Sequence, residues 1–540
     1  MITVTGKGVS GGVVIGRIAF YRRNEIKVRK RKVGDSREEI RRFLEARKKA
    51  DLQLQRLYEK SLHDVGRENA VIFEIHRMIL DDQEYGDAVI RMIQEEKVNA
   101  EYAVSRTANR LAELFASMED VYMQGRVADI RDVSGRLLLN LSGGRREEMT
   151  PEEPVILAAD DLMPSETVQL ERSQILGLVT SQGATTSHSV ILAKTMNIPA
   201  VIGVGEGLRL EYDGKMAILD GKEGKLYVDP DEQTLERMQR KLREEQVWKE
   251  LLSHLKGKEN KTQSGRTIEV CANIGSLPDV EKARENDAGG IGLFRSEFLY
   301  LERDTYPSEE EQLAVYRQAA QQMEGKRVII RTMDIGADKR AGYFELEEEE
   351  NPALGFRAIR FSLMRPQIFK TQLRAVYRAS AYGKIAVMFP MIISLEEVRR
   401  IKELIEEVKR ELLREQLKFS DDVEIGVMIE TPAAVMISRE LAREVDFFSV
   451  GTNDLTQYTL AVDRQNRKLE AFYDPYHPAV MSMIRMAADN AHAEGKWIGI
   501  CGELASDLHL TEQFLEMGID ELSVAPGMIL PLRKHIRSLK

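Results

Sequence analysis

The spacing of hydrophobic residues changes along this chain, and each change predicts a different kind of structure. Over residues 34–142 apolar positions recur every three or four residues, as at Ile40 and Phe43, which is the spacing of one face of a helix. Ser36 and Glu39 form a capping-box pattern at the start of this stretch. The pattern predicts an all-helical block.

On both sides of this block, short apolar runs are separated by Gly, Pro and Asp, which is typical of strands. The runs are Ile2–Val4, Gly12–Tyr21, Val155–Ala158, Ile175–Ser181, Ala200–Val204, Met216–Leu219 and Leu226–Val228. We expect them to share one sheet, so that residues 1–20 and 144–230 form a small α/β domain with residues 21–143 as a helical insertion. A polar, helical stretch over residues 231–262 predicts a linker.

From residue 263 onward, apolar runs alternate with amphipathic helical stretches. The runs are Thr267–Asn273, Gly290–Arg295, Arg327–Met333, Ile385–Met391, Glu424–Glu430, Phe447–Asn453, Trp497–Cys501 and Glu521–Val524. Regular alternation favours a (β/α)₈ barrel over residues 263–540, which places the carboxyl ends of its strands on one rim. The predicted fold class is therefore multidomain α/β: a small α/β domain with an all-helical insertion, followed by a TIM-type barrel.

Composition excludes several classes of protein. The chain has 540 residues, of which 43% are hydrophobic and 31% charged, so it is large enough for several cores and polar enough to be soluble. A net charge of −10 argues against nucleic-acid binding, and no apolar run approaches the ~18 residues of a membrane span. Met1–Gly6 lacks the features of a signal peptide. Two widely separated cysteines, Cys271 and Cys501, indicate free thiols and a cytoplasmic protein.

One histidine lies where a predicted strand turns into a helix. His188 follows the small residues Gly183-Ala184-Thr185-Thr186-Ser187 and precedes an apolar helix. A helix N-terminus offers unpaired backbone N–H groups and the positive end of the helix dipole, and these groups bind phosphate. A neutral imidazole here is therefore a candidate phosphoryl acceptor, although a histidine that only packs or caps the helix start has the same local pattern.

Reactive side chains gather at the predicted carboxyl ends of the barrel strands. They are Arg295, Arg331, Glu430, Asn453, Asp454 and Cys501, with Arg464 a little beyond the sixth run. A single arginine or carboxylate at a strand end is usually a structural ion pair, but burying so many is costly unless they bind a ligand or one another. Arginines grip phosphate and carboxylate, two carboxylates with a substrate phosphate form a typical Mg²⁺ site, and a thiol can protonate an enolate. The rim therefore predicts a small, doubly anionic phosphate ester as substrate.

Together these motifs resemble the Enzyme I family of the bacterial phosphotransferase system, the phosphoenolpyruvate-protein phosphotransferases. The resemblance extends over essentially the whole chain. The segments that carry it are Gly183–Ser189, Gly292–Glu297, Arg331–Lys339, Glu430–Ala434, Gly451–Tyr458 and Cys501–Leu504. It implies an enzyme that transfers the phosphoryl group of phosphoenolpyruvate to its own histidine and then to the phosphocarrier protein HPr, releasing pyruvate, as the first step of sugar uptake by this system.

The resemblance also implies a role for each site residue. His188 matches the histidine phosphorylated on Nε2, Thr167 a hydroxyl that hydrogen-bonds it, and Cys501 the proton donor to the enolate of pyruvate. The other matched residues are Arg295, Arg331 and Arg464, which hold phosphoenolpyruvate, Asn453 and Asp454, which contact its phosphate and metal, and Glu430 and Asp454, which bind Mg²⁺. The helical insertion matches the HPr docking site, and the barrel of the family forms a homodimer.

Two features depart from the family pattern. Ala184 and Thr185 stand where relatives often have Gly and Arg, so a role of that Arg has no counterpart here. The chain ends at Lys540, soon after the last predicted barrel helix, Leu530–Ile536, where many relatives have another helix. We expect this second difference to affect dimer strength and not the rim.

Several alternatives share part of the pattern. Pyruvate phosphate dikinase and phosphoenolpyruvate synthase have the histidine loop and the barrel, but they need a nucleotide-binding domain, and the sequence has no Walker loop. A non-catalytic regulator would use only the helical block and leave the rim chemistry without a purpose. The nitrogen-regulatory paralogue carries a sensory domain upstream, which is not expected from this sequence.

Overall fold

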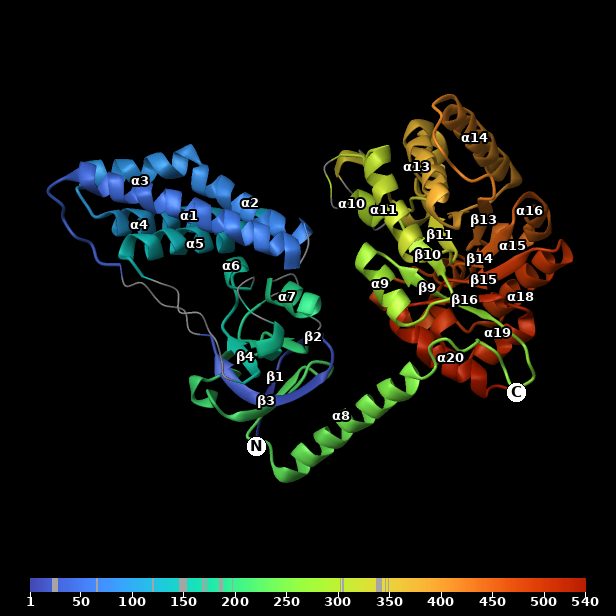
Figure 1. Cartoon of the computed structure of the whole chain (residues 1–540), viewed down its shortest axis with the longest axis horizontal. Coiled ribbons are helices and arrows are strands. Elements are labelled where there is room, and N and C mark those ends of the chain that lie inside the picture. Colours follow the sequence, from blue (N-terminus) through green and yellow to red (C-terminus); the bar gives the residue numbers. More distant parts are fainter. Residues whose placement is uncertain are drawn as a thin grey trace. The chain divides into compact units, whose positions relative to one another are not determined.

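The computed structural model describes residues 1–540 except 22–27, 65–66, 119–120, 145–152, 168–169, 171, 184–187, 197, 302, 304, 337–341, 345 and 348. It divides into two compact units, Met1–Glu245 and Gln246–Lys540, which are described separately (Figure 1).

The first unit contains an eight-stranded sheet with the strand order β1-β8-β7-β3-β4-β5-β6-β2. Its strands are β1 (Ile2–Thr5), β2 (Lys7–Ser10), β3 (Val13–Phe20), β4 (Val155–Ala159), β5 (Ile175–Thr180), β6 (Ala200–Ile202), β7 (Met216–Asp220) and β8 (Lys225–Val228). Neighbours from β3 to β6 are parallel, and the other pairs are antiparallel. The N-terminal strands and those after residue 154 thus share one sheet. The sequence prediction missed β2, because Gly8 and the flanking glycines interrupt its apolar pattern.

Both faces of this sheet are covered. Successive residues of β4 alternate between two apolar clusters, with Ile156 and Ala158 in one and Leu157 and Ala159 in the other. The second cluster includes Leu192 of α7 (His188–Met196). The sheet therefore anchors the helix that begins at His188.

The helical insertion consists of α1 (Ser36–Asp64), α2 (Arg67–Asp81), α3 (Gln83–Glu96), α4 (Ala100–Ala116) and α5 (Val121–Ser142). Its separate core includes buried residues of the predicted stripes, such as Phe43 and Leu54, together with Phe73, which was not predicted. After it, the short helix α6 (Pro164–Thr167) follows β4.

The predicted capping box at the start of α1 is wrong. The carboxylate of Asp35 accepts the backbone N–H of Arg37 at 2.8 Å, and the hydroxyl of Ser36 donates to the carbonyl of Ile93. Glu39 is used elsewhere, because its Oε2 accepts the N–H of Ala100 at 2.8 Å and so caps α4. Glu39 therefore caps a helix that is distant in sequence and does not form the predicted capping box with Ser36.

The second unit contains a closed barrel with the strand order β9-β10-β11-β12-β13-β14-β15-β16, and the parallel pairing of β16 with β9 closes it. The strands are β9 (Glu269–Ile274), β10 (Ile291–Arg295), β11 (Val328–Arg331), β12 (Ile385–Phe389), β13 (Glu424–Ile429), β14 (Phe447–Val450), β15 (Trp497–Ile500) and β16 (Glu521–Val524). The helices are α9 (Leu277–Glu285), α10 (Phe298–Leu301), α11 (Glu309–Gln322), α12 (Ile359–Met364), α13 (Pro366–Ala379), α14 (Leu395–Arg414), α15 (Pro432–Met436), α16 (Ser438–Glu444), α17 (Thr452–Leu460), α18 (Pro478–Ala493), α19 (Thr511–Met517) and α20 (Ile529–Ser538), which surround the strands (Figure 1). The predicted fold class is confirmed.

The sixth barrel strand is shorter than predicted. The sequence prediction extended it to Asn453, but β14 ends at Val450 and α17 begins at Thr452. Between them, Gly451 lies so close to Glu430 that a Cβ atom there would be 2.7 Å from Oε2. The chain turns at this glycine, and Asn453 and Asp454 therefore lie on the first turn of a helix.

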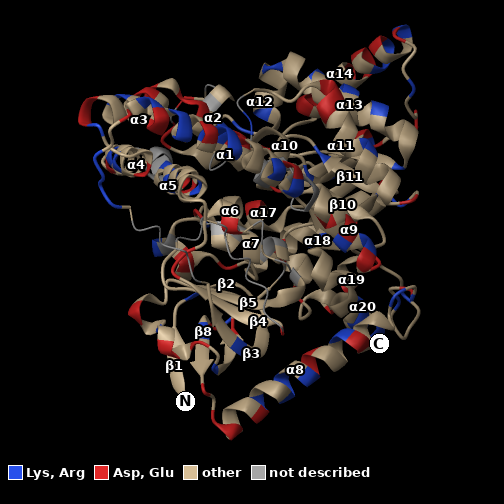
Figure 2. Ribbon diagram, turned by 60° about the vertical axis from the view of Figure 1, so that its left-hand side comes forward, with Lys and Arg blue, Asp and Glu red and all other residues tan. Residues whose placement is uncertain are grey.

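The linker contains the helix α8 (Glu232–Ser253), which begins in the first unit and ends in the second. Acidic and basic residues are interspersed along it (Figure 2). Among the described residues, no helix has the length and apolar character needed to cross a membrane.

Candidate active site

The predicted rim residues lie at one end of the barrel. Arg295 and Arg331 are the last residues of β10 and β11, and Glu430 and Cys501 directly follow β13 and β15. Because the barrel strands are parallel, their carboxyl ends meet on a single rim. The sequence therefore placed these side chains at the correct end of the barrel.

The surroundings of the Glu430 carboxylate bear directly on what the site can bind. Its side chain is buried, and its Oε1 accepts the backbone N–H of Met391 at 2.6 Å. Its Oε2 is also buried and has no hydrogen-bond partner among the described residues. Burial, followed by the nearby carboxylates of Asp454 and Asp334, raises the pKa of Glu430 to about 8, although Arg331 and Arg357 act in the opposite direction. A buried carboxylate with one unused oxygen is suited to binding a cation.

A chain of buried ion pairs connects the carboxylates of the rim. Arg331 Nη2 donates to Glu297 Oε1 at 2.8 Å, and its Nη1 lies 3.2 Å from Asp334 Oδ2. Arg357 Nη2 donates to Asp334 Oδ1 at 2.8 Å, and its Nη1 donates to Asp454 Oδ1 at 3.4 Å. These contacts hold the arginines in fixed positions, as binding of a doubly charged ligand requires.

Arg464 adds a second cation at Asp454. Its Nη1 donates to Asp454 Oδ2 at 3.2 Å, and its backbone N–H donates to Gln457 Oε1. Its side chain is 32% exposed, whereas that of Arg357 is only 8% exposed. Arg464 thus has room for a ligand beside Asp454.

Arg357 is a candidate site residue that sequence reasoning missed. It lies in the strand-free stretch between β11 and α12, and in sequence it is many residues away from the end of β11. Its neighbour Ala358 has a φ of 52°, which is rare for a residue other than glycine, and Gly336 approaches so closely that a Cβ there would be 2.4 Å from the Arg357 Cβ. No spacing in the sequence reveals this packing, and Glu297 and Asp334 were likewise assigned no role.

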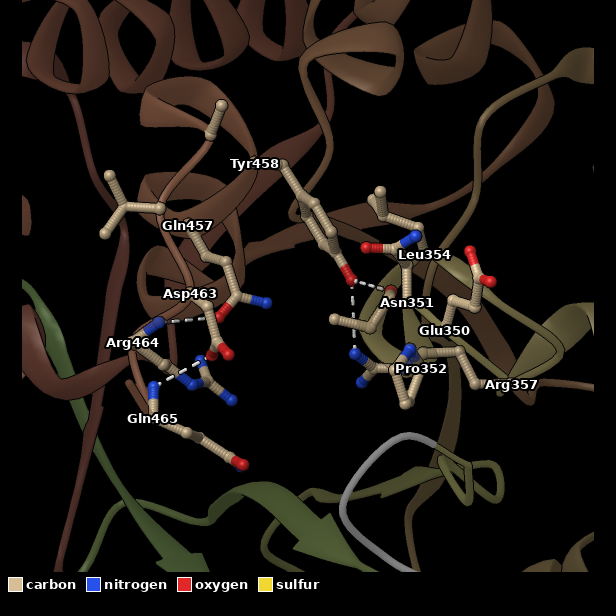
Figure 3. Close-up of a pocket in the computed structure, with 13 residues that line it drawn as sticks. Glu350, Asn351, Pro352, Leu354, Arg357, Gln457, Tyr458, Asp463, Arg464 and Gln465 are labelled. Atoms are coloured by element: carbon tan, nitrogen blue, oxygen red, sulfur yellow. Dashed lines mark hydrogen bonds between the residues drawn. The ribbon is translucent and has the colours of Figure 1, made fainter. Parts of the chain in front are cut away.

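A pocket of about 420 Å³ opens beside these arginines (Figure 3). Arg357 and Tyr458 line one side of it, with Arg357 Nη1 donating to the Tyr458 hydroxyl at 3.2 Å, and Arg464 lines the other. The pocket has the size of a small metabolite site, and its lining includes two arginines and the carboxylates of Glu350 and Asp463.

Cys501 is a buried thiol near the same charges. Its side chain is 2% exposed, and its Sγ donates to the carbonyl of Val450 at 3.7 Å. Burial is the largest influence and raises the pKa of Cys501 to about 11; the charge of Glu430 also raises it, whereas those of Arg331 and Arg295 lower it. The thiol is therefore protonated at neutral pH and can donate a proton.

Arg295 and Asn453 complete the predicted set. Arg295 is exposed, and its side chain has no hydrogen bond or ion pair with another described residue. Asn453 Oδ1 accepts the backbone N–H of Glu503 at 3.0 Å, which fixes its amide beside Asp454. Both side chains retain polar atoms for a ligand.

His188 and Thr167 belong to the first unit. His188 begins α7, as predicted, but its side chain and residues 184–187, including Ala184 and Thr185, lie outside the described residues. Ser189, the next residue, donates to Asp161 Oδ1 at 2.9 Å and accepts the backbone N–H of Leu162. Thr167 is buried and donates to the carbonyl of Pro164 at 2.7 Å.

A second acidic cluster lies at the opposite, amino end of the barrel strands. Glu269, Cys271 and Glu521 bring ligand atoms within 4.8 Å of one another. This cluster already contains a cation, because Arg327 Nη2 lies 2.8 Å from both Glu269 and Glu521. The unused oxygen of Glu430 fits a metal ion better than these paired carboxylates do.

The family models that match this chain describe enzymes that use phosphoenolpyruvate (PEP), a small phosphate ester of the kind that the rim residues suit. Three family models of PEP-utilising enzymes match: the PEP-binding domain over residues 249–540, the N-terminal domain over 5–126 and the mobile domain over 151–224.

Curated relatives extend over nearly the whole chain. The phosphoenolpyruvate-protein phosphotransferase of Haemophilus influenzae is 42% identical, over 99% of this chain and 94% of that protein. The enzyme of the same name from Bacillus subtilis is 40% identical, over 100% of this chain and 95% of that protein. A solution structure of an Enzyme I protein is 34% identical over 45% of this chain and 99% of its own, with a TM-score of 0.40. The chain belongs to the phosphoenolpyruvate-protein phosphotransferase family, the Enzyme I proteins.

Proposed function

We propose that this enzyme transfers the phosphoryl group of phosphoenolpyruvate to Nε2 of His188 and then to HPr, with release of pyruvate. The observation that carries the proposal is the rim: buried carboxylates form ion pairs with Arg357 and Arg464, these two arginines line a small pocket, and a further buried carboxylate has an unused oxygen. Full-length similarity to phosphoenolpyruvate-protein phosphotransferases supports the same substrate.

Arg295, Arg331 and Arg464 hold the substrate in this proposal, and Arg357 is added to them. A transferring phosphoryl group needs charge stabilisation and alignment more than covalent help from the protein. Arg331 and Arg357 are already fixed by Glu297 and Asp334, so little side-chain entropy is lost when the ester binds. Asn453 donates its amide to the phosphate.

Glu430 and Asp454 would hold Mg²⁺. Their oxygens suit a hard cation, and the unused Oε2 of Glu430 fits this role. When bound, the ion supplies positive charge to the phosphate oxygens of the substrate. Its charge would also offset the repulsion from Asp454 that contributes to the raised pKa of Glu430.

Cys501 is the proton donor in this proposal. In the transfer step the bond between phosphorus and the enolate oxygen breaks, and a bond between phosphorus and Nε2 of neutral His188 forms. The thiol proton then passes to the methylene carbon of the enolate, which becomes the methyl group of pyruvate. Its elevated pKa keeps that proton in place at neutral pH. Thr167 orients His188 through a hydrogen bond.

The helical insertion is the proposed docking site for HPr. A groove of about 1010 Å³ lies between its helices, lined by exposed or half-buried apolar side chains that include Met78, Leu111 and Leu114. The charged residues of its lining have both signs: Arg110, Arg126, Asp82, Glu84 and Glu113. An apolar floor with edges of mixed charge suits a small protein partner with a mixed surface. Because His188 serves two partners, the region that carries it moves between them in this proposal.

Two further properties complete the proposal. The protein is cytoplasmic, because its two cysteines are both buried free thiols. It forms a homodimer through the barrel, where Met364 and Phe472 expose large apolar surfaces.

The test is incubation with labelled phosphoenolpyruvate and Mg²⁺, followed by mapping of the acid-labile label. We expect the label on His188, its passage to HPr when HPr is added, and no label in His188→Ala. His254→Ala, which changes an exposed histidine, is the matched control. Label on any other residue, or label that requires a nucleotide as in the dikinases, contradicts the proposal.

A further inference from the structure

A buried polar cluster crosses the first unit from the helical insertion to α6. It consists of His76 on α2, Asp129 and Asp132 on α5, and Ser165 on α6. The exposed fraction is 0% for His76 and Ser165, 2% for Asp129 and 4% for Asp132. Burying two carboxylates is costly unless they are fully paired, so the cluster must be held together by specific contacts.

Asp132 makes the contacts that join the two parts. Its Oδ1 accepts the hydroxyl of Ser165 at 2.5 Å, and its Oδ2 accepts the backbone N–H of the same residue at 3.0 Å. Both donors of Ser165 therefore bind one carboxylate across a gap of 33 residues in sequence. Hydrogen bonds to a charged acceptor are stronger and more directional than neutral ones.

The same cluster extends to the docking groove. Arg126, which lines the groove, donates from Nη1 to Asp129 Oδ2 at 2.9 Å. His76 Nε2 lies 3.1 Å from Asp129 Oδ1, and its Nδ1 lies 4.0 Å from Asp132 Oδ2. Burial alone raises the pKa of Asp129, but the contacts with His76 and Arg126 outweigh it and lower the pKa overall. Buried polar side chains thus extend from the groove wall to the residue that binds α6, with hydrogen bonds from Arg126 to Asp129 and between Asp129 and His76, and with His76 beside Asp132 but not hydrogen-bonded to it.

α6 in turn contacts the helix that begins at His188. It contains Ser165 and Thr167, contacts α5 on one side and packs against α7 on the other. The place of α7 relative to the groove therefore depends on how α6 is held. From the insertion, the Asp132 carboxylate accepts two hydrogen bonds from Ser165 of α6.

We propose that Asp132 is a positioning residue for the transfer from His188 to HPr: it fixes α6, and through it α7, against the helical insertion. This inference rests on the proposed function, because it assumes that HPr occupies the groove and receives the phosphoryl group from His188. Asp132 touches neither substrate nor the reacting atoms. Only the second half-reaction requires His188 to be aligned with a partner seated on the insertion, whereas the first uses the barrel.

The test measures the two half-reactions separately in Asp132→Ala by rapid quenching. We expect transfer from phosphorylated enzyme to HPr to fall about 10- to 100-fold, because a displacement of the order of 1 Å has such an effect on a reacting pair. We expect the KM for HPr, and phosphorylation from phosphoenolpyruvate, to stay within twofold. A merely structural role would instead lower both half-reactions together.

Partner variants sharpen the result. Ser165→Ala removes the same contact from the other side, and Asp132→Ala with Ser165→Ala should be no slower than either alone. Asp132→Asn keeps an acceptor for the Ser165 hydroxyl and should recover part of the rate. Asp51→Ala, which breaks the ion pair with Arg77 elsewhere in the insertion, is the matched control and should leave both half-reactions unchanged.

Three outcomes overturn the inference: equal loss in both half-reactions, no loss in either, or a raised KM for HPr with an unchanged maximal rate. Circular dichroism and the thermal midpoint of each variant identify a loss caused by unfolding, which also counts against a positioning role. Failure of the proposed function gives a different result, because the unmodified enzyme would then acquire no label on His188 or pass none to HPr.

Discussion

The two ends of the barrel use the same residue types for different purposes. At the carboxyl end, Arg331 and Glu430 lie near Cys501. At the amino end, Arg327 and Glu521 lie near Cys271. Each end thus contains an arginine that is at most 15% exposed, a buried glutamate and a buried thiol, so residue type alone does not reveal which end is reactive.

The ends differ in how the charges are paired. At the amino end, Arg327 binds Glu521 and Glu269 at 2.8 Å and stacks 4.1 Å above the ring of Trp497. At the carboxyl end, Glu430 has a buried oxygen without a partner among the described residues. Removing one partner of a buried ion pair destabilises a fold, whereas a buried carboxylate without a cation beside it is a candidate for binding one. At the amino end Glu424 Oε2 also lacks a hydrogen bond, but it lies 3.6 Å from Arg327 Nη1. The distance from each carboxylate to a cation, and not the presence of charges, identifies the functional end.

The largest effect is expected from breaking the ion pairs at the amino end of the barrel. Arg327→Met removes the cation between Glu269 and Glu521 and leaves a buried charge uncompensated. We expect the free energy of unfolding to fall by about 3–5 kcal/mol. Urea unfolding of the purified protein measures it.

The turnover of the folded fraction is the control for this variant. We expect it to stay within twofold of the parent, because Arg327 lies at the opposite end from the proposed chemistry. A large loss of turnover in folded protein would show that the amino end takes part in the reaction.

At the carboxyl end of the barrel, a substitution should lower activity and not stability. Glu430→Gln removes a proposed cation ligand and keeps the size of the side chain. We expect turnover to fall about 10²–10³-fold, as when one electrostatic group of an active site is lost. We expect the unfolding free energy to stay the same or rise, because the glutamine replaces a carboxyl that burial and the neighbouring carboxylates make costly to ionise, which raises its pKa to about 8.

Glu521→Gln is the matched control, since it makes the same chemical change at the amino end. We expect it to lower stability and leave turnover unchanged. If both variants lost activity equally, the distinction between the ends would be wrong.

The sequence predicted most of the carboxyl rim because its residues are tied to strand ends. Arg331 and Glu430 follow apolar runs directly, and parallel strands bring such positions together whatever their separation in sequence. Asn453 was placed on a strand and lies on a helix, yet it stays on the rim because the chain turns only at Gly451. The sequence pattern therefore identified the rim correctly, and only the local element was wrong.

Other contacts could not be predicted because no local pattern encodes them. Arg357 reaches Asp334 from a stretch with no periodicity, through close packing against Gly336. Asp132 binds Ser165 across the border between the insertion and the sheet region. Both depend on how separate elements pack, which the spacing of residues in one element does not contain.

Replacing the two thiols tests the comparison next. In Cys501→Ala we expect pyruvate formation to slow about 10²-fold, at the lower end of general-acid effects, while phosphoenolpyruvate binding is retained. In the parent, the pKa of about 11 keeps the thiol protonated, so this group should cause no change in rate between pH 7 and 9 and a fall only as pH approaches 11.

Cys271→Ala is the control at the amino end and should form pyruvate at the parental rate. Stopped-flow detection of pyruvate and a binding titration separate the two effects of Cys501→Ala. Loss of phosphoenolpyruvate binding in that variant would remove the acid role of Cys501.

The smallest expected effect distinguishes the two carboxylates that Arg327 binds. The side chain of Glu269 is 62% exposed, whereas that of Glu521 is 2% exposed, although both lie 2.8 Å from the same Nη2. Exposed ion pairs contribute about 0.2–1 kcal/mol and weaken with salt, because water and ions screen them. We therefore expect Glu269→Gln to lower the unfolding free energy by no more than this, and the difference to shrink in 1 M NaCl. Urea unfolding at low and high salt measures it; a loss as large as that of Glu521→Gln would mean that proximity to Arg327, and not burial, determines how much each carboxylate contributes.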